Sequence, residues 1–453
     1  MEQEHVNNTN GAHMQKSEKH MHKETNAERK KNKKKREKGG GVFPKRIPYA
    51  LLVLAMGLAA AALMAAMIVV DLLPTNLTLA IIVMIIVMLV ISSLLLARRS
   101  RWKRILGILV SLLFIAVLGG LTYYLTESYA MLNTISDKND FSNAERTGAS
   151  IDPTEEPFNI YITGIDQWAN EKGLDLERSD VNMIVTVNPK TKKILLTSIP
   201  RDTYVKLHTM QLMDKLTHTG VYGVDETLST VEDWLGIDLS YYVKMNFTGA
   251  RRVINAMGGI DIYNPVEFES SLKGYKYEKG WIHLGGKKAL YYARERHAFE
   301  GQDSIRVENQ QRVIKAMIKK MTSSTTLLTK YGEIMKTAGE NLHTSMSYDE
   351  IRNLVKMQMT DLAEWDVQTQ KIEGEYDMDY VASLTQSQKF SIYRPDADSV
   401  RKCVDSIYGV LHPTASELEE AERIRDKSFV ENMIRLLTNR NTEDGEDETQ
   451  QQG

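Results

Sequence analysis

The most prominent feature of the sequence is a set of three long apolar runs near its start. Residues 47–70, 77–97 and 105–125 contain no charged side chain. Each run is close to the roughly 20 residues that an α-helix needs to cross a hydrocarbon layer about 30 Å thick. The first run is too long and starts too far into the chain for a cleaved signal peptide. The pattern therefore predicts three retained transmembrane helices.

The charges around these runs predict how the helices cross the membrane. The turn "DLLPTN" (71–76) has no Lys or Arg, whereas "RRSRWKR" (98–104) is mostly basic. Ten basic residues stand between Arg29 and Arg46 against a single acid, Glu37. Because basic segments beside a span stay in the cytoplasm, we expect a multi-pass cell-membrane protein with a cytoplasmic N-terminus. Everything beyond the third run is then extracellular.

Beyond the membrane runs, short apolar segments alternate with amphipathic ones. The predicted strands are "FNIYITGID" (158–166), both arms of the hairpin "VNMIVTVNPKTKKILLTSIPRD" (181–202), "IDLSYYVKMN" (237–246), "IDIYN" (260–264) and a last one near 390–393. The predicted helices cover about 224–235, 247–257, 286–292 and 303–321, with more helix between 322 and 412. This alternation predicts an α/β fold in which helices flank a central mixed β-sheet, an αβα sandwich.

Composition changes divide the chain further. We expect a disordered basic tail (1–46), the membrane helices (47–125), a polar linker (126–155), a catalytic domain (156–412), and a charged helix over 416–437 followed by an acidic tail within 413–453. No groove-reading or aromatic pattern accompanies the basic tail, so we expect no nucleic-acid partner. Cys403 is the single cysteine, which rules out an intrachain disulfide.

Charged residues gather where the predicted strands begin and end. They are Asp166 after the first strand, Arg178 and Asp180 before the second, and Arg201 and Asp202 after the third. If the hairpin pairs beside the first strand, these residues meet at one edge of the sheet, where α/β proteins bind ligands. Arg294 and Arg296 follow a helix, and Arg306 and Gln310 share one helical face.

This composition favours a phosphate site. Arginine grips phosphate oxygens in a bidentate manner, and two carboxylates among the arginines could hold Mg²⁺. The alternative is that each residue is a turn, cap or surface ion-pair residue of little energetic weight. The motifs GxSxG, HExxH and the P-loop are absent, so the usual hydrolase and nucleotide-triphosphatase signatures give no support.

An ordered set of motifs resembles the LytR-CpsA-Psr family over about residues 156–412. The motifs are "ITGID" (162–166), "RSD" (178–180), "SIPRDTYV" (198–205), "DKLTHTGVYG" (214–223), "YYVKMNF" (241–247), "INAMGGIDIY" (254–263), "GWIHLGGKKALYYARER" (280–296) and "RVENQQRVIKAM" (306–317). The resemblance implies a membrane-anchored phosphotransferase facing outward. Such enzymes move a glycopolymer, wall teichoic acid or capsular polysaccharide, from an undecaprenyl-pyrophosphate carrier to peptidoglycan.

The resemblance also implies roles for the charged residues. Asp166 and Asp180 would be ligands of Mg²⁺, or of Mn²⁺ in its place; Arg178, Arg201, Arg294, Arg296, Arg306, Gln310 and Lys215 would contact the pyrophosphate; Arg201, Asp202, Arg294 and Arg296 would act in catalysis. Asp180 or Asp202 could accept the proton of the attacking hydroxyl. The polyprenyl chain would lie in an apolar tunnel between sheet and helices.

The chain departs from the family pattern before the catalytic part, and two other functions are alternatives. Streptococcal members with three spans carry an accessory domain before the catalytic part, and only about 30 residues stand there in this chain. A protein that binds lipid pyrophosphate and regulates envelope assembly, as in the transcriptional-attenuator description of the family, is one alternative. A pyrophosphatase, in which water replaces the sugar hydroxyl, is another.

Overall fold

The computed structural model describes residues 47–97, 100–136, 151–165, 179–296, 302–384, 387–417 and 419. Asp166, Arg178, the basic tail and most of the predicted C-terminal helix and acidic tail lie outside the described residues. The described residues form two compact units, one of residues 47–60 with those between 85 and 117 and the other of residues 61–84 with those from 118 onward. The α/β fold described below belongs to the second unit.

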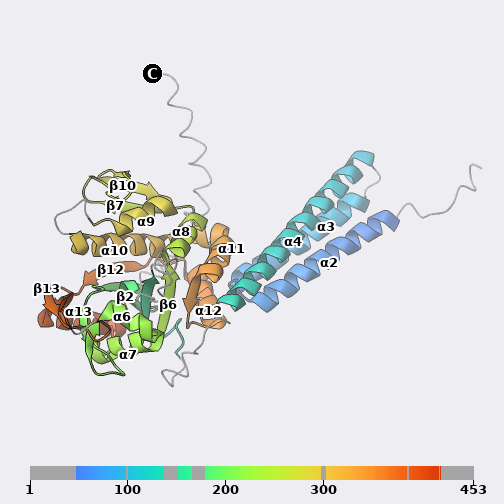
Figure 1. The fold of residues 1–453 in the computed structure, drawn as a ribbon. Coiled ribbons are helices and arrows are strands. Elements are labelled where there is room, and N and C mark those ends of the chain that lie inside the picture. Colours follow the sequence, from blue (N-terminus) through green and yellow to red (C-terminus); the bar gives the residue numbers. More distant parts are fainter. Residues whose placement is uncertain are drawn as a thin grey trace, which may run out of the picture. The chain divides into compact units, whose positions relative to one another are not determined.

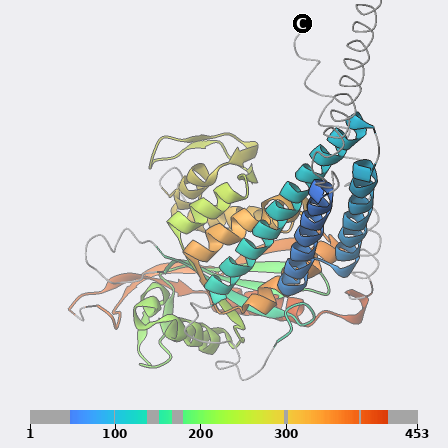
Figure 2. The same ribbon diagram turned by 90° about the vertical axis from the view of Figure 1, so that its right-hand side faces the viewer.

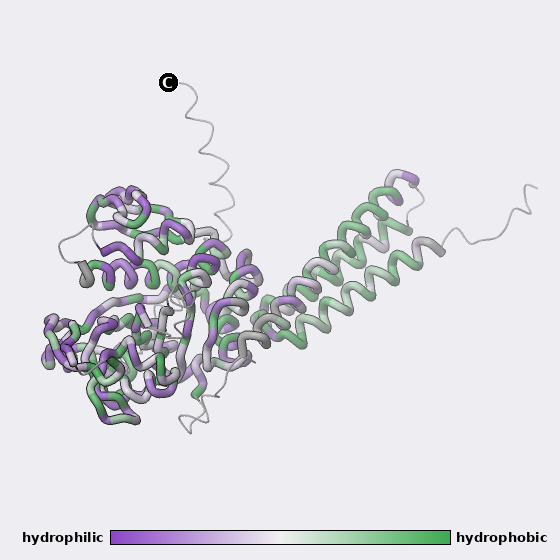
Figure 3. The backbone as a smooth tube through the Cα atoms, viewed as in Figure 1, coloured by the Kyte–Doolittle hydropathy of each residue, from purple (hydrophilic) through white to green (hydrophobic). Residues whose placement is uncertain are grey.

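Three apolar helices occupy the predicted membrane runs. They are α2 (Ile47–Val70), α3 (Thr75–Ala97) and α4 (Arg101–Ser136). Each contains a stretch long and apolar enough to cross a membrane, and Figure 3 shows their hydrophobic colouring. Helix α4 continues past the predicted end of the third run, because no Gly or Pro interrupts residues 121–136.

A six-stranded mixed sheet forms the centre of the α/β fold (Figure 1). Its strands, in spatial order, are β11 (Leu342–Thr344), β6 (Tyr241–Asn246), β1 (Phe158–Ile165), β2 (Ser179–Asn188), β3 (Lys193–Ile199) and β12 (Asp366–Lys371). Strand β1 pairs antiparallel with β2 and parallel with β6, and β2 and β3 form the predicted hairpin. The turn of this hairpin is fixed by Asn188, whose side-chain oxygen accepts from the N–H groups of Lys190 and Thr191 at 3.1 Å each.

Helices cover both faces of the sheet. The remaining helices are α6 (Leu216–Thr219), the 3₁₀ turn η2 (Gly220–Tyr222), α7 (Val224–Leu235), α8 (Phe247–Ala256), α9 (Gly286–Arg294), α10 (Gln302–Met321), α11 (Ser324–Asn341), α12 (Tyr348–Asp361) and α13 (Ala397–Leu411). Ile184 of β2 packs with α7 and α13 on one face, and Met183 and Val185 pack with α10 and α12 on the other. Figures 1 and 2 show α7 and α10 on opposite sides of the sheet, so the predicted αβα sandwich is confirmed.

Short two-stranded ribbons complete the fold. They are β4 (Tyr204–Lys206) with β5 (Met213–Lys215), β7 (Ile260–Asn264) with β10 (Gly280–Leu284), β8 (Phe268–Glu269) with β9 (Lys276–Tyr277), and β13 (Gly374–Asp379) with β14 (Phe390–Pro395). The strand predicted over 237–246 begins only at Tyr241, because Ile237 and Leu239 pack into the core before it. Helix α7 ends as predicted at Gly236, whose φ of 67° is the left-handed conformation that glycine adopts readily.

Candidate functional site

One edge of the sheet gathers residues from several strand ends. Asn182 of β2 pairs with Ile199 of β3, so the start of β2 lies beside the end of β3. Ile165, at the end of β1, pairs with Ser179 of β2 and with Asn246 of β6. Residues that precede β2 or follow β1, β3 and β6 therefore meet at this edge, as the predicted hairpin required.

A cleft of about 310 Å³ opens at this edge. Among the described residues it is lined by Asp180, Arg201, Phe247, Ser271, Leu272, Arg294, Arg296, Arg306 and Gln310. Four of these are arginines and one is an acid, so the described lining is cationic. The structure thus brings together six of the ten predicted site residues; of two more, Asp202 pairs with the lining residue Arg201, and Lys215 pairs with Asp202.

Arg201 is the centre of an ion-pair network. Its Nη1 donates to Asp180 Oδ1 at 2.6 Å, and its Nε donates to Asp202 Oδ2 at 3.3 Å. Lys215 Nζ in turn donates to Asp202 Oδ1 at 3.2 Å. These pairs are partly exposed, so we expect them to orient the Arg201 guanidinium more than to stabilise the fold.

Arg306 and Gln310 enter the cleft from helix α10. They are spaced four residues apart, share one face of the helix, and are only 4% and 7% exposed. Burying a guanidinium is costly unless negative charge or hydrogen-bond acceptors compensate it. A buried arginine that faces a cleft beside three others is therefore suited to binding an anion.

Arg294 is held over an aromatic ring. It is the last residue of α9, and its Cζ lies 5.0 Å from the centroid of the Phe247 ring at the start of α8. The start of α8 is fixed by Asn246, whose side chain accepts from the Gly249 N–H at 2.6 Å. Phe247 thus limits where the guanidinium can point, through a cation–π contact.

Sequence reasoning missed Phe247, Ser271 and Leu272 as lining residues. Ser271 and Leu272 belong to the turn between β8 and β9, and Phe247 follows β6. None of these residue types carries charge or ligand chemistry that would single it out in a sequence. Their presence in the cleft depends on how the turn and the helix pack, which only the fold reveals.

Comparison with known proteins identifies the family. The model of the LytR_cpsA_psr family matches residues 122–407. The chain belongs to this family. The resemblance inferred from the motifs is therefore confirmed.

Individual relatives of this LytR_cpsA_psr protein are named as transferases. The chain is 32% identical over 260 residues to the polyisoprenyl-teichoic acid–peptidoglycan teichoic acid transferase TagU of Bacillus anthracis, covering 56% of this chain and 83% of that protein. It is 34% identical over 258 residues to TagU of Bacillus subtilis, covering 56% and 82%. The crystal structure of TagV from B. subtilis matches 57% of this chain and 98% of that one, with 31% identity and a TM-score of 0.48.

Asp180 is the acidic residue among the described lining residues of this LytR_cpsA_psr member that could bind a metal ion. Within the described residues, no group of three or more His, Cys, Asp or Glu side chains is placed to hold a metal ion. Mg²⁺ needs no such group, because it binds through one or two carboxylates and completes its shell with water and phosphate oxygens. Asp180 lines the cleft and can supply one carboxylate, although its Oδ1 also pairs with Arg201.

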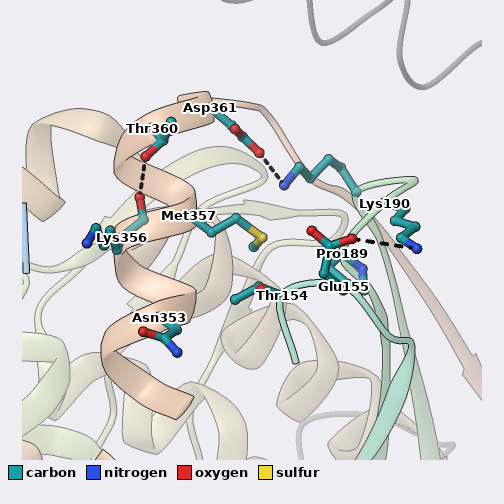
Figure 4. Close-up of a pocket in the computed structure, with 10 residues that line it drawn as sticks. Thr154, Glu155, Pro189, Lys190, Asn353, Lys356, Met357, Thr360 and Asp361 are labelled. Carbon is teal, nitrogen blue, oxygen red and sulfur yellow. Dashed lines mark hydrogen bonds and ion pairs between the residues drawn. The ribbon is translucent and has the colours of Figure 1, made fainter. Parts of the chain in front are cut away.

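A second cleft, of about 750 Å³, is larger but lacks this chemistry (Figure 4). It lies between helix α12, the turn after β2 and residues 154 and 155. Lys192 pairs there with Asp361 at 2.7 Å, and Lys190 pairs with Glu155 at 3.6 Å. Because these lysines are neutralised by acids, this cleft is a weaker candidate for an anionic ligand than the arginine-lined one.

A buried polar cluster lies beside Lys215. Asp214 is fully buried, and its Oδ1 lies 2.7 Å from His218 Nδ1. Ser383 contributes its N–H to Asp214 Oδ2 at 2.8 Å and places its Oγ 2.7 Å from the same His218 nitrogen. Burial raises the pKa of Asp214, but hydrogen bonds from His218, Ser383 and the Lys215 N–H outweigh burial and lower the pKa below its ordinary value.

The contact between Arg294 and Phe247 leads to a testable expectation. Phe247→Leu should weaken binding of inorganic pyrophosphate to the purified chain by roughly fivefold, because a cation–π contact is worth about 1 kcal/mol. Phe247→Tyr keeps the ring and should bind like the parent protein. Isothermal titration calorimetry can measure both. Equal affinities for the two variants would mean that the ring does not position Arg294.

Proposed function

We propose that this protein is a membrane-anchored transferase that moves a glycopolymer from a polyprenyl-pyrophosphate carrier to peptidoglycan. The observation that carries the proposal is the cleft in which Arg201, Arg294, Arg296 and Arg306 converge, in a member of a family whose relatives are named as teichoic acid transferases. A pyrophosphate diester is an anion with several closely spaced oxygens. Guanidinium groups match such oxygens by bidentate hydrogen bonds, which lysines cannot form.

The apolar layer beside the cleft supports a lipid carrier. Ile160 and Ile162 of β1 and Ile314 and Ile318 of α10 pack on the core of this layer but are only partly buried. Partly buried aliphatic side chains between a sheet and a helix leave apolar surface that a prenyl chain can cover. We propose that the polyprenyl chain is bound here, with its pyrophosphate in the arginine cleft.

The proposed reaction is a displacement at phosphorus. A hydroxyl oxygen of peptidoglycan forms a bond to the phosphorus attached to the glycopolymer, and the bridging oxygen leaves with the polyprenyl phosphate. The hydroxyl proton passes to a base, for which Asp180 and Asp202, whose carboxylates pair with Arg201, are the candidates; a carboxylate that binds a cation is a weak base, so Asp202 is the candidate where Asp180 holds one. The arginines stabilise the negative charge on the transferring and leaving phosphates, which is the main demand of phosphoryl transfer.

A divalent cation would add to this stabilisation. We propose that Asp180, together with Asp166, holds Mg²⁺ or Mn²⁺, which would neutralise charge on the phosphate oxygens. Chelation with EDTA should then lower the transfer rate at least tenfold, and addition of excess MgCl₂ or MnCl₂ should restore it. Transfer at the full rate in EDTA, after treatment that removes bound metal, would contradict the metal proposal and leave the arginine cleft in place.

The orientation of the chain follows from the substrate. Peptidoglycan lies outside the cell membrane, so we propose that α2, α3 and α4 anchor the protein with its N-terminus in the cytoplasm and its α/β domain outside. The basic loop between α3 and α4 agrees with this orientation. The transferred polymer would be wall teichoic acid, as in the names of the relatives, or a capsular polysaccharide.

A transfer assay tests the function. The purified full-length chain in detergent is given a lipid-pyrophosphate-linked teichoic acid precursor, peptidoglycan fragments and MgCl₂, and the products are analysed by mass spectrometry. We expect a phosphodiester between polymer and peptidoglycan, together with released polyprenyl phosphate. Polymer phosphate formed without acceptor would indicate a pyrophosphatase. Saturable binding without any product would indicate the regulatory alternative.

A further inference from the structure

A buried carboxylate separates the two arginines of "RER". Glu295 is completely buried, whereas Arg294 and Arg296 on either side of it line the cleft. Its Oε2 accepts from the Ser271 N–H at 2.9 Å, and its Oε1 accepts from the Ser271 hydroxyl at 2.8 Å and from the Arg296 N–H at 3.0 Å. These hydrogen bonds compensate the cost of burying the charge.

The backbone explains why the carboxylate turns away from the cleft. Helix α9 ends at Arg294, and Glu295 has extended backbone angles, φ −66° and ψ 132°. Successive side chains of an extended segment point to opposite sides. With Glu295 directed inward, the following Arg296 is directed toward the cleft, and the Glu295 hydrogen bond to its N–H holds that arrangement.

Ser271, which also bonds to Glu295, belongs to a wall of the cleft. Ser271 and Leu272 belong to the turn between β8 and β9 and line the cleft, and Leu272 is 45% exposed. The turn keeps its own shape, because the Ser270 N–H donates to the Tyr275 carbonyl and the Gly274 N–H donates to the Ser270 carbonyl, each at 2.8 Å. Glu295 therefore fixes where this turn lies relative to the arginines.

The base of the same hairpin is held separately. Phe268 of β8 stacks on Tyr277 of β9 at a centroid distance of 4.8 Å and contacts Tyr292 of α9 at 5.5 Å. These rings are almost completely buried. Weakening the Glu295 contacts should therefore release the tip of the hairpin while its base stays packed on α9.

Electrostatics alone would not favour an acid at this position. A carboxylate beside two arginines reduces the positive potential that an anionic ligand meets. Its presence is consistent with anion binding only if its structural effect on the cleft outweighs that loss. The three hydrogen bonds to Ser271 and Arg296 provide such an effect.

We propose that Glu295 is a positioning residue, which fastens the 270–275 turn to the segment of Arg294 and Arg296 and so shapes the wall of the anion cleft. This inference rests on the proposed function for the identity of the ligand. Glu295 does not touch the substrate in this proposal; it acts through Ser271 and Arg296.

A double-mutant cycle tests the proposal. Glu295→Gln, Ser271→Ala and the double variant are made in the full-length chain, and binding of a short-chain polyprenyl pyrophosphate is measured by calorimetry together with KM and kcat for transfer. Glu295→Gln should weaken binding about tenfold, as expected for lost hydrogen bonds to a charged group. Because the Ser271 hydroxyl acts through Glu295 in this proposal, the double variant should bind no more weakly than Glu295→Gln.

Ser406→Ala is the matched control, because the Ser406 hydroxyl donates only within helix α13, to the Lys402 carbonyl at 2.9 Å, and Ser406 is not among the residues that line the cleft, so this variant should bind like the parent chain. Additive effects of Glu295→Gln and Ser271→Ala on binding would overturn the proposal. Tighter binding by Glu295→Gln would also overturn it, because it would show that the Glu295 charge only opposes the ligand. If Glu295→Gln does not fold, unaltered binding by Ser271→Ala would overturn it as well.

The same measurements separate this inference from the proposed function. Suppose that the parent chain binds the lipid pyrophosphate without transferring polymer, and that the effects of the substitutions on binding are not additive. This result would refute the transferase and support the positioning role. Suppose instead that the parent chain transfers polymer and that Glu295→Gln leaves KM and affinity unchanged. This result would support the transferase and refute the positioning role.

Discussion

Replacing Arg294 by alanine should lower kcat/KM for polymer transfer by about 10³-fold, because charge-stabilising donors and arginines in phosphoryl-transfer sites each contribute on the order of 10²–10⁵ in rate. Arg294 lines the cleft and is oriented by the Phe247 ring. It has no large role in the core, so the thermal unfolding midpoint should change by only a few degrees. Transfer is measured with a lipid-linked precursor and peptidoglycan fragments.

Two further substitutions make the result specific. Arg294→Lys keeps the charge but loses the bidentate geometry, so we expect an intermediate rate. Arg401→Ala removes an arginine whose side chain is 73% exposed and which pairs with Asp398 on helix α13. It should leave the rate unchanged. A folded Arg294→Ala protein with the rate of the Arg401→Ala control would remove Arg294 from the catalytic site.

Much of the sheet could be predicted from the sequence, because its central strands are long and apolar. Strand β2 is buried along nearly its whole length, and its hairpin partner β3 follows a clear turn signal. Strands β4, β5 and β8 to β13 were not predicted. The sequences of β12, "DVQTQK", and β13, "GEYDMD", are polar. Val367 is the buried apolar residue of β12. Among the described strands of the main sheet, β12 lies at one edge and pairs only with β3. Such strands are defined by their neighbours more than by their own pattern.

The meeting of the candidate residues could be predicted where it depends on the ends of strands. The prediction failed where the meeting depends on loops. Asp180 and Arg201 meet because they stand at adjoining ends of a hairpin, which the turn "NPKT" already fixed. Arg306 and Gln310 meet the cleft because of their helical spacing. Glu295 and Ser271 are close in space but 24 residues apart, and no periodicity links them. Packing of the β8–β9 turn on α9 determines that contact.

The largest effect on stability should come from Asp214. Asp214→Ala removes an acceptor shared by His218, Ser383 and the Lys215 N–H in a fully buried place. Because removing one partner of a buried charged cluster leaves the others unsatisfied, we expect the free energy of unfolding to fall by about 3–5 kcal/mol. Denaturant unfolding of the full chain in one detergent, followed by tryptophan fluorescence, measures this change.

Asp261→Asn provides a matched control and acid provides a second test. Asp261 also pairs with a histidine, His283, at 2.7 Å, but both side chains are 57% exposed, so its loss should change stability by less than about 0.5 kcal/mol.

The pKa of Asp214 is lowered in the fold from the ordinary 3.8, so its carboxylate stabilises the fold above that pH. That contribution is lost as the pH falls through the lower folded-state pKa. The parent chain should therefore lose more stability in acid than Asp214→Asn, and parallel acid profiles would show that this carboxylate is not held in the fold as described.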